Sequence, residues 1–225
     1  MKTLTAILMA SALLAPIVSA NDREEVDRAA ATIQRMQHMP DRGIPRSIMR
    51  NAKGFAIVRV YKAGLGISGS IGDGVVVART KNGWSGPAFI GMGGAGGGPQ
   101  VGAEATDFVF VLNSRRAVDA FSRRANLTLG GDLSVTAGPV GRDVEADLTP
   151  IAAIYTYSQS KGLFLGASIQ GAVLGSRPDA NKAFYGREVS PGAILAGKVK
   201  APRAAAPLLE ALENSGYNGK RVAQR

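Results

Sequence analysis

The chain has 225 residues and a formal net charge of +10, from 27 lysines and arginines against 17 acidic residues. Its hydrophobic share of 45% and charged share of 20% are those of a globular protein with a core. The basic excess favours anionic partners such as phospholipid head groups, nucleic acid or an acidic protein surface, although it also serves solubility alone. Because the chain contains no cysteine, disulfides, thiolate metal sites and a cysteine nucleophile are excluded.

The first twenty residues, 1–20, have the pattern of a signal peptide. Met1 to Thr3 form a short basic start, and the apolar run from Leu4 to Val18 is too short to span a bilayer comfortably. Pro16 and the small residues that end at Ala20 predict cleavage after Ala20. We therefore expect an exported chain, periplasmic or secreted, that begins at Asn21 and is peripherally associated with a membrane.

Two helices are predicted next. The first, over 21–39, has acids in its first turn and a modest apolar stripe. The second runs from Pro45 to about Ala52, and Arg46, Arg50 and Lys53 fall on one side of it. A basic edge over an apolar underside suits contact with an anionic surface, and an ordinary solvated face is the alternative.

The middle of the chain is predicted to be β-structure. Short runs of β-branched and aromatic residues alternate with glycine, and Asn82-Gly83 is a strong hairpin signal between two of them. A turn is predicted at Thr106-Asp107. The predicted strands span 55–61, 65–70, 74–79, 84–90, 101–105 and 108–112.

The second half adds one more helix before the chain returns to strands. That helix covers 115–124 and is capped by Asn113-Ser114. Strands over 127–137, 151–158 and 163–173, a loop over 178–185 and a last helix over 207–214 are predicted to follow. No linker divides the chain, so we predict one α+β domain over 21–216 and a basic disordered tail over 217–225. Its core is predicted to be glycine-rich and mostly antiparallel, barrel-like or sandwich-like, with helices at both ends and one inserted midway.

Glycine is concentrated in the centre of the chain. Of the 29 glycines, 14 lie between Gly64 and Gly102, where only three residues are charged. Two stretches match Gly-x-Gly-x-x-Gly, but neither leads into a helix, as a dinucleotide-binding fingerprint requires. We interpret the glycines as letting short strands turn and pack closely, with 91–98 as a flexible or bulged crossing.

Candidates for catalysis or metal binding are few. His38, the only histidine, is predicted at the fraying end of a helix, where a structural or solvent-facing role is favoured over a Ser-His-Asp system. Glu104 with Asp107 forms one potential acid/base group, but turns attract acids for backbone reasons. A second such group consists of Asp143, Glu145 and Asp147. One histidine and no cysteine disfavour zinc, so no enzyme activity, cofactor or metal is predicted.

Trp84 is the only tryptophan and follows the predicted hairpin turn. A lone indole after such a turn most often anchors a core. Insertion of Trp84 into a membrane interface, where indoles are favoured, is the alternative.

Several phrases of the chain, taken together, resemble one family, the SYLF domain. Each phrase is weak alone, but they follow in order and at similar spacing over about residues 21–216. The phrases include Ala52-Lys53-Gly54-Phe55-Ala56-Ile57, Gly72-Asp73-Gly74-Val75-Val76-Val77-Ala78-Arg79, Trp84-Ser85-Gly86-Pro87-Ala88 and Tyr155-Thr156-Tyr157-Ser158-Gln159-Ser160-Lys161-Gly162-Leu163-Phe164.

The resemblance implies a non-enzymatic module that binds anionic phospholipid. Eukaryotic members bind phosphoinositides, partly through an amphipathic amino-terminal helix, and some bind and bundle actin. The predicted signal peptide argues against cytosolic phosphoinositides and actin as natural partners. The first mature helix carries four acids against three arginines, which disfavours membrane binding through it.

We therefore predict that anionic phospholipid head groups contact Arg46, Arg50, Lys53 and Lys62 at a membrane or envelope surface, with the first mature helix as the alternative element. The second hypothesis is a protein-interaction module whose partner is an envelope or host protein, with actin by family analogy alone. Nucleic acid is not an expected partner.

Overall fold

The structure is a computed structural model that describes residues 17–39, 43–123, 127–129, 135–137, 153–164 and 172–216. The described helices are α2 (Ile17–His38), α3 (Arg46–Asn51), α4 (Arg115–Ser122), α5 (Pro178–Tyr185), α6 (Pro191–Leu195) and α7 (Ala206–Gly216), with a 3-10 turn at Arg203–Ala205. The described strands are β1 (Gly54–Thr80), β2 (Gly83–Trp84), β3 (Ala88–Leu112), β4 (Leu127–Thr128), β5 (Val135–Ala137), β6 (Ile154–Phe164) and β7 (Val173–Ser176). None of these helices combines the length and the apolar character needed to cross a membrane.

One long antiparallel ribbon, made of β1 and β3, forms the centre of the sheet. β1 has 27 residues and β3 has 25, and they pair from Gly54 opposite Leu112 to Val76 opposite Ala88. β6 continues the sheet from the second half of β3, and β7 continues it from the first half. The sheet order is β2-β1-β3-β6-β5, with β4 attached to β7.

The ribbon folds back on itself, so that the two halves of β1 lie against each other. Near the ends of β1, the N–H of Arg79 donates a 2.8 Å hydrogen bond to the carbonyl oxygen of Lys53. Further along, a Cβ atom at Gly74 would overlap the carbonyl oxygen of Ile57, and Gly72 is similarly crowded. Because glycine has no Cβ, it allows this approach of one backbone to another.

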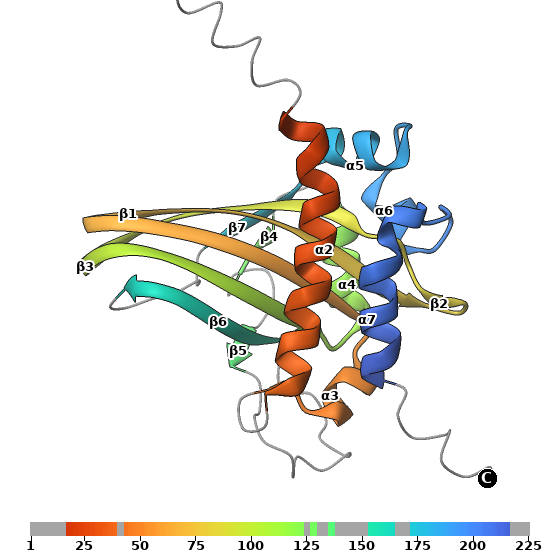
Figure 1. Cartoon of the computed structure of the whole chain (residues 1–225), viewed down its shortest axis with the longest axis horizontal. Helices are drawn as coiled ribbons and strands as arrows, with labels where there is room; N and C mark the ends of the chain where they lie inside the picture. The colour runs from red at the N-terminus through yellow and green to blue at the C-terminus, as the bar shows by residue number, and fades with distance from the viewer. Residues whose placement is uncertain are drawn as a thin grey trace, which may run out of the picture.

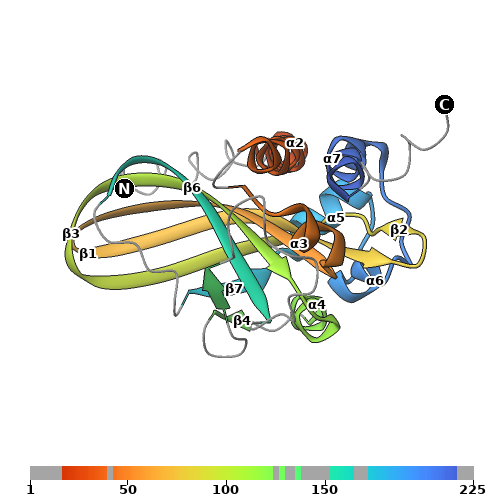
Figure 2. The ribbon, with the colours of Figure 1, turned by 90° about the horizontal axis from the view of Figure 1, so that it is seen from below.

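Each face of the curled sheet has its own hydrophobic core, because side chains alternate along a strand. On one face, Phe55 and Ile57 pack beneath α2, α3, α5 and α7. On the other face, Ala56 and Val58 pack with α4 and α6 inside the curl. α2 and α7 lie side by side across the strands (Figure 2). The sheet projects well beyond α2, on the side away from α7 (Figure 1).

The predicted fold class is confirmed, since the domain is α+β with a curled antiparallel sheet, a half-barrel, and helices at both ends. The hairpin predicted at Asn82-Gly83 is also confirmed. It joins β1 to β2, and Gly83 adopts a φ of +106° there.

The predicted breaks between strands are wrong. The strands over 55–61, 65–70 and 74–79 are one strand, β1, and those over 101–105 and 108–112 belong to β3, with no turn at Thr106-Asp107. The segment 91–98 is mostly a regular ladder too, because Gly91 pairs with Asp73 and Gly93 with Ile71. The one register shift falls later, between Gly97 and Val101 on β3. A glycine in an extended conformation keeps its backbone N–H donor and C=O acceptor, so it continues the ladder like any other residue.

The loop predicted over 178–185 is wrong as well, because this segment is the helix α5. Pro178 stands at the start of α5, Asp179 lies in its first turn, and Gly186 ends it at a φ of +68°. Such residues cap a helix as readily as they break one. The first helix begins at Ile17, earlier than predicted, and so overlaps the predicted signal peptide at 17–20. The rest of that peptide and the predicted tail lie outside the described residues.

The substitution Gly74→Ala is expected to destabilise the domain, because its Cβ atom would overlap the backbone of the facing half of β1. Overpacking of this kind lowers the free energy of unfolding by about 1–3 kcal/mol. Guanidinium denaturation of the purified chain would measure the change.

Gly69→Ala is the matched control, since an added Cβ at Gly69 meets no atom within 4 Å. An equal loss of stability in both variants would show that close approach at Gly74 does not hold the curl.

Candidate functional site

The short helix α3 presents the basic edge that its sequence predicts. Its underside is buried through Ile48 and Met49, whereas Arg46, Arg50 and the following Lys53 are exposed. Burial of the apolar side fixes the orientation of the helix, so the cations are held toward solvent.

Two further arginines lie at the same end of the sheet. The N–H of Lys53 donates a 2.8 Å hydrogen bond to the carbonyl oxygen of Leu112, at the end of β3, and α4 starts shortly after it. Arg115 and Arg116 are exposed in the first turn of α4, where the helix macrodipole disfavours cations. Two arginines at the amino-terminal end of a helix reduce its stability, and this cost is a signal in the sequence that could have indicated a functional role.

We call these five exposed cations the basic end: Arg46, Arg50, Lys53, Arg115 and Arg116. Within the described part of the chain, none of them forms an ion pair. The basic end therefore presents positive charge that no described acidic side chain neutralises by a direct contact.

Lys62, the fourth predicted head-group residue, lies elsewhere. It is on β1, opposite Glu104 in the ladder, and is partly buried. Eight residues of extended chain separate it from Gly54, a span of about 26 Å. The structure thus brings Arg46, Arg50 and Lys53 together and leaves Lys62 apart from them.

Trp84 is half-buried in β2. Its ring packs against Phe55 with the centroids 5.5 Å apart, and the guanidinium of Arg79 lies 4.2 Å from the indole centroid. This is the core-anchoring arrangement that its sequence position favours. Membrane insertion of Trp84 stays a prediction.

A row of polar side chains crosses the sheet where α2 covers it. Asp107 accepts hydrogen bonds from Arg59 at 2.6 Å and from Arg35 of α2 at 2.8 Å. Arg28 of α2 pairs with Asp73 in the same row. Burial opposes ionisation of Asp107, but its hydrogen bonds and the arginine charges outweigh that effect and hold its pKa below the ordinary value. We call Asp73, Arg59 and Asp107 the polar row.

Glu104 and Asp107, the acid/base group considered in the sequence, are not placed to act together. Asp107 lies within β3 rather than in a turn, and its carboxylate is paired with two guanidinium groups. Glu104 accepts a 2.6 Å hydrogen bond from Thr106, and its odd-numbered spacing from Asp107 places it on the opposite face of the strand. The two acids therefore do not form a site together.

The other catalytic or metal-binding candidates of the sequence form no site among the described residues. Among the described residues, no set of three or more histidine or acidic side chains is placed to hold a metal ion. His38 is exposed and its Nδ1 lies 2.7 Å from the carbonyl oxygen of Gln34, within its own helix. The predicted acids Asp143, Glu145 and Asp147 lie outside the described residues.

A second charged group joins α2 to the end of β7. Arg177 donates a 2.7 Å hydrogen bond to Glu25 and lies 3.7 Å from Asp22, and both acids are buried. Among the described residues, one carboxylate oxygen of each acid has no hydrogen-bond partner. Burial, partly offset by Arg177, raises the pKa of Glu25 to about 8.

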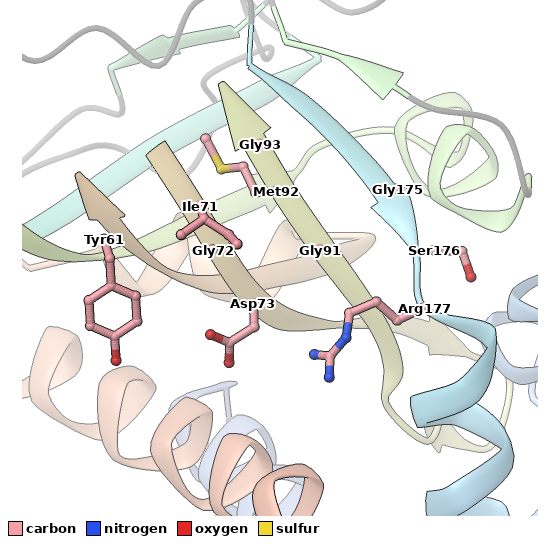
Figure 3. A pocket seen from close by; sticks show the side chains of 10 residues that line it. All are labelled: Tyr61, Ile71, Gly72, Asp73, Gly91, Met92, Gly93, Gly175, Ser176 and Arg177. Carbon is pink, nitrogen blue, oxygen red and sulfur yellow. The ribbon is translucent and has the colours of Figure 1, made fainter. Parts of the chain in front are cut away.

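A hollow of about 630 Å³ opens between this charged group and the projecting part of the sheet. Figure 3 shows the Arg177 and Asp73 side chains at one side of it, with Ile71 and Tyr61 toward the other. Much of its wall is glycine, which leaves the backbone of the sheet accessible. Sequence reasoning missed this surface because it treated the glycines as breaks.

These features define a class of protein: an α+β domain of about 200 residues with a basic end and a projecting sheet. A family model described as "Las17-binding protein actin regulator" (Ysc84) matches residues 93–215. The chain belongs to this Ysc84 family, also called SYLF, and the predicted family is thereby confirmed.

Named relatives agree with this assignment. The chain is 49% identical to Protein YSC84 and 46% identical to LAS seventeen-binding protein 3, both of Saccharomyces cerevisiae, over 79% of its length. It is 40% identical to SH3 domain-containing YSC84-like protein 1 of Homo sapiens over 88% of its length. The matches span 39%, 40% and 60% of these relatives, and none of their names denotes an enzyme.

The substitution Glu25→Gln is expected to change how stability depends on pH. A pKa raised from 4.5 to about 8 means that the folded state binds the proton more tightly than the unfolded state. The free energy of unfolding should therefore fall as the pH rises through this range. Glutamine cannot ionise, so the variant should lose less stability between pH 5 and pH 8.5 in urea denaturation.

Glu24→Gln is the matched control, because Glu24 is exposed on the same helix. Identical pH dependence in the wild type and both variants would contradict a raised pKa at Glu25.

Proposed function

We propose that the chain is a protein-interaction module of the actin-regulatory type and that its basic end contacts the partner. The family description, which names Las17 binding and actin regulation, supports this class of function. The observation that carries the proposal is the basic end, whose five cations are exposed without ion pairs among the described residues. Such a surface attracts an acidic protein surface and orients it during encounter.

The partner's identity depends on where the chain works. We propose export through the predicted leader, with cleavage after Ala20. An acidic envelope or host protein is then the natural partner, and actin is the example that the family supplies. Amino-terminal sequencing of the protein recovered from its source would test this, and an intact Met1 would contradict it.

Anionic phospholipid is the second candidate ligand for the basic end. It is supported by the build of α3, which sets Arg46 and Arg50 above a buried apolar side and so holds both charges at one surface. Each basic residue near an anionic membrane contributes about 1 kcal/mol. Lipid and protein would compete for the same cations, so one set of variants tests both.

Co-sedimentation with actin filaments, and separately with anionic and neutral vesicles, would test the proposal. The double variant Arg46→Glu with Arg50→Glu should weaken filament binding about tenfold or more, because it replaces attraction by repulsion at the contact. Binding of the wild type should also fall as the salt concentration is raised from about 50 to about 300 mM, because this shortens the Debye length to less than half.

The matched control is Arg23→Glu with Arg187→Glu, which makes the same charge change at two exposed arginines near α5, toward the other end of α2. Binding to anionic vesicles alone, lost in the α3 variant, would favour the lipid candidate. Filament binding that both double variants weaken equally would contradict a role for the basic end.

A further inference from the structure

Among the described residues, the exposed large apolar side chains form one row across the projecting part of the sheet. Ile71 is 71% exposed, Tyr61 47% and Val173 36%. Val173 and Ile71 both pair with Gly93, from its two sides. Ile71 and Tyr61 are neighbours across the two halves of β1, since they line the same two hollows. These three side chains are the ridge.

A second row, beyond the ridge, is made of small residues. Gly69 pairs with Ala95 and Ala63 pairs with Ala103, and all four are exposed. Gly69 is two residues from Ile71 along β1, and Ala63 is two residues from Tyr61. Because side chains alternate along a strand, the second row lies on the same face of the sheet as the ridge. The ridge and this second row are the apolar face, and neither row contains a charged residue.

The ridge has a hollow on each side. The hollow of about 630 Å³ lies between the ridge and the side chains of Asp73 and Arg177 (Figure 3). A second hollow of about 400 Å³ lies over the small residues and is lined by Ala63, Gly69 and Ala103 among others. Volumes of this size accept several apolar side chains.

The apolar face continues a layer of helices that is already present. α7 and α2 lie side by side over the same side of the sheet, and the face begins where α2 ends its cover (Figures 1 and 2). The apolar face crosses five adjacent strand segments, from β7 through the two halves of β1 to the second half of β3. This is a span of about 20 Å, the length of a helix of about 13 residues. From the polar row to the small residues the face is about 13 Å wide, close to the diameter of one helix.

We propose that the apolar face binds an amphipathic helix of a partner protein, which lies beside α2 as a third member of the helical layer. Apolar residues spaced three and four apart on that helix fill the two hollows around the ridge. A carboxylate on the edge next to α2 faces Arg35, because Arg35 and Arg59 share the single carboxylate of Asp107 and leave a positive charge in excess. This inference goes beyond the proposed function, since the basic end takes no part in it.

The size of the face favours a helix over a second copy of the chain. Its outline of about 20 Å by about 13 Å gives roughly 260 Å². Each partner of a stable protein complex buries about 800 Å². An anionic membrane is also disfavoured, because the arginines that border the face are paired with acids and leave only the single excess charge that Arg35 and Arg59 share.

A random 16-residue peptide library, selected on the full chain and counter-selected on its Ile71→Glu variant, would test the proposal. The expected winners carry apolar residues at helical spacing with an acid on one flank. A synthetic winner should become helical on binding in circular dichroism. Ile71→Glu should weaken its binding by about tenfold or more, since it places a charge in the centre of the contact.

Two variants control the experiment. Ala63→Arg, on the second row, should give a similar loss without altering the ridge, and Arg187→Glu, an exposed change near α5, should give none. Ile71 is largely exposed, so unchanged thermal unfolding of the Ile71→Glu variant is the check that it folds.

Three results would overturn the proposal. The first is the absence of any peptide that distinguishes the wild type from Ile71→Glu. The second is binding of winners in an extended conformation, which would indicate strand addition. The third is self-association of the chain that Ile71→Glu abolishes, which would assign the face to a second copy.

Discussion

The close contact between the two halves of β1 is the constraint on which the rest of the structure depends. The ribbon consists of two strands, each about 25 residues long, and it curls back on itself without separating its partners. At Gly72 and Gly74 the facing backbone occupies the space of a Cβ atom. The curl brings the ends of β1 together, and with them α3, the hairpin at β2 and the start of α4. The basic end is assembled at that junction from segments more than sixty residues apart in the chain.

The polar row divides the outer face of the sheet into two parts with different roles. On one side of it, Ile57 and its neighbours are buried under α2 and α7. On the other side, Ile71 and Tyr61 are exposed, although they stand on the same face of the same strand. Arg28 and Arg35 tie α2 to the polar row and so fix where the helical cover stops. Specific ion pairs of the domain therefore leave the part of the sheet that extends beyond α2 uncovered.

Local patterns predicted α2, α3, α4, α7 and the strand content, because those depend on spacing within a few residues. The basic edge of α3 follows from Arg46 and Arg50 four residues apart above a buried Ile48. The continuity of β1 could not be predicted in the same way. Glycine occurs both in turns and in strands, so its conformation cannot be assigned until the partner strand is known. The pairing of Asp107 with Arg59 and Arg35 depends on residues 48 and 72 positions away. For the same reason Lys62 was grouped with cations that lie at the far end of its strand.

Hydrogen exchange of the chain bound to actin filaments, or to anionic vesicles if only these bind, tests the central claim most directly. Slower exchange is expected at residues 46–53 and at the start of α4, with α5 unchanged, because the basic end would be covered by the partner. Protection confined to α5 and the first turns of α2, with none at α3, would contradict the account.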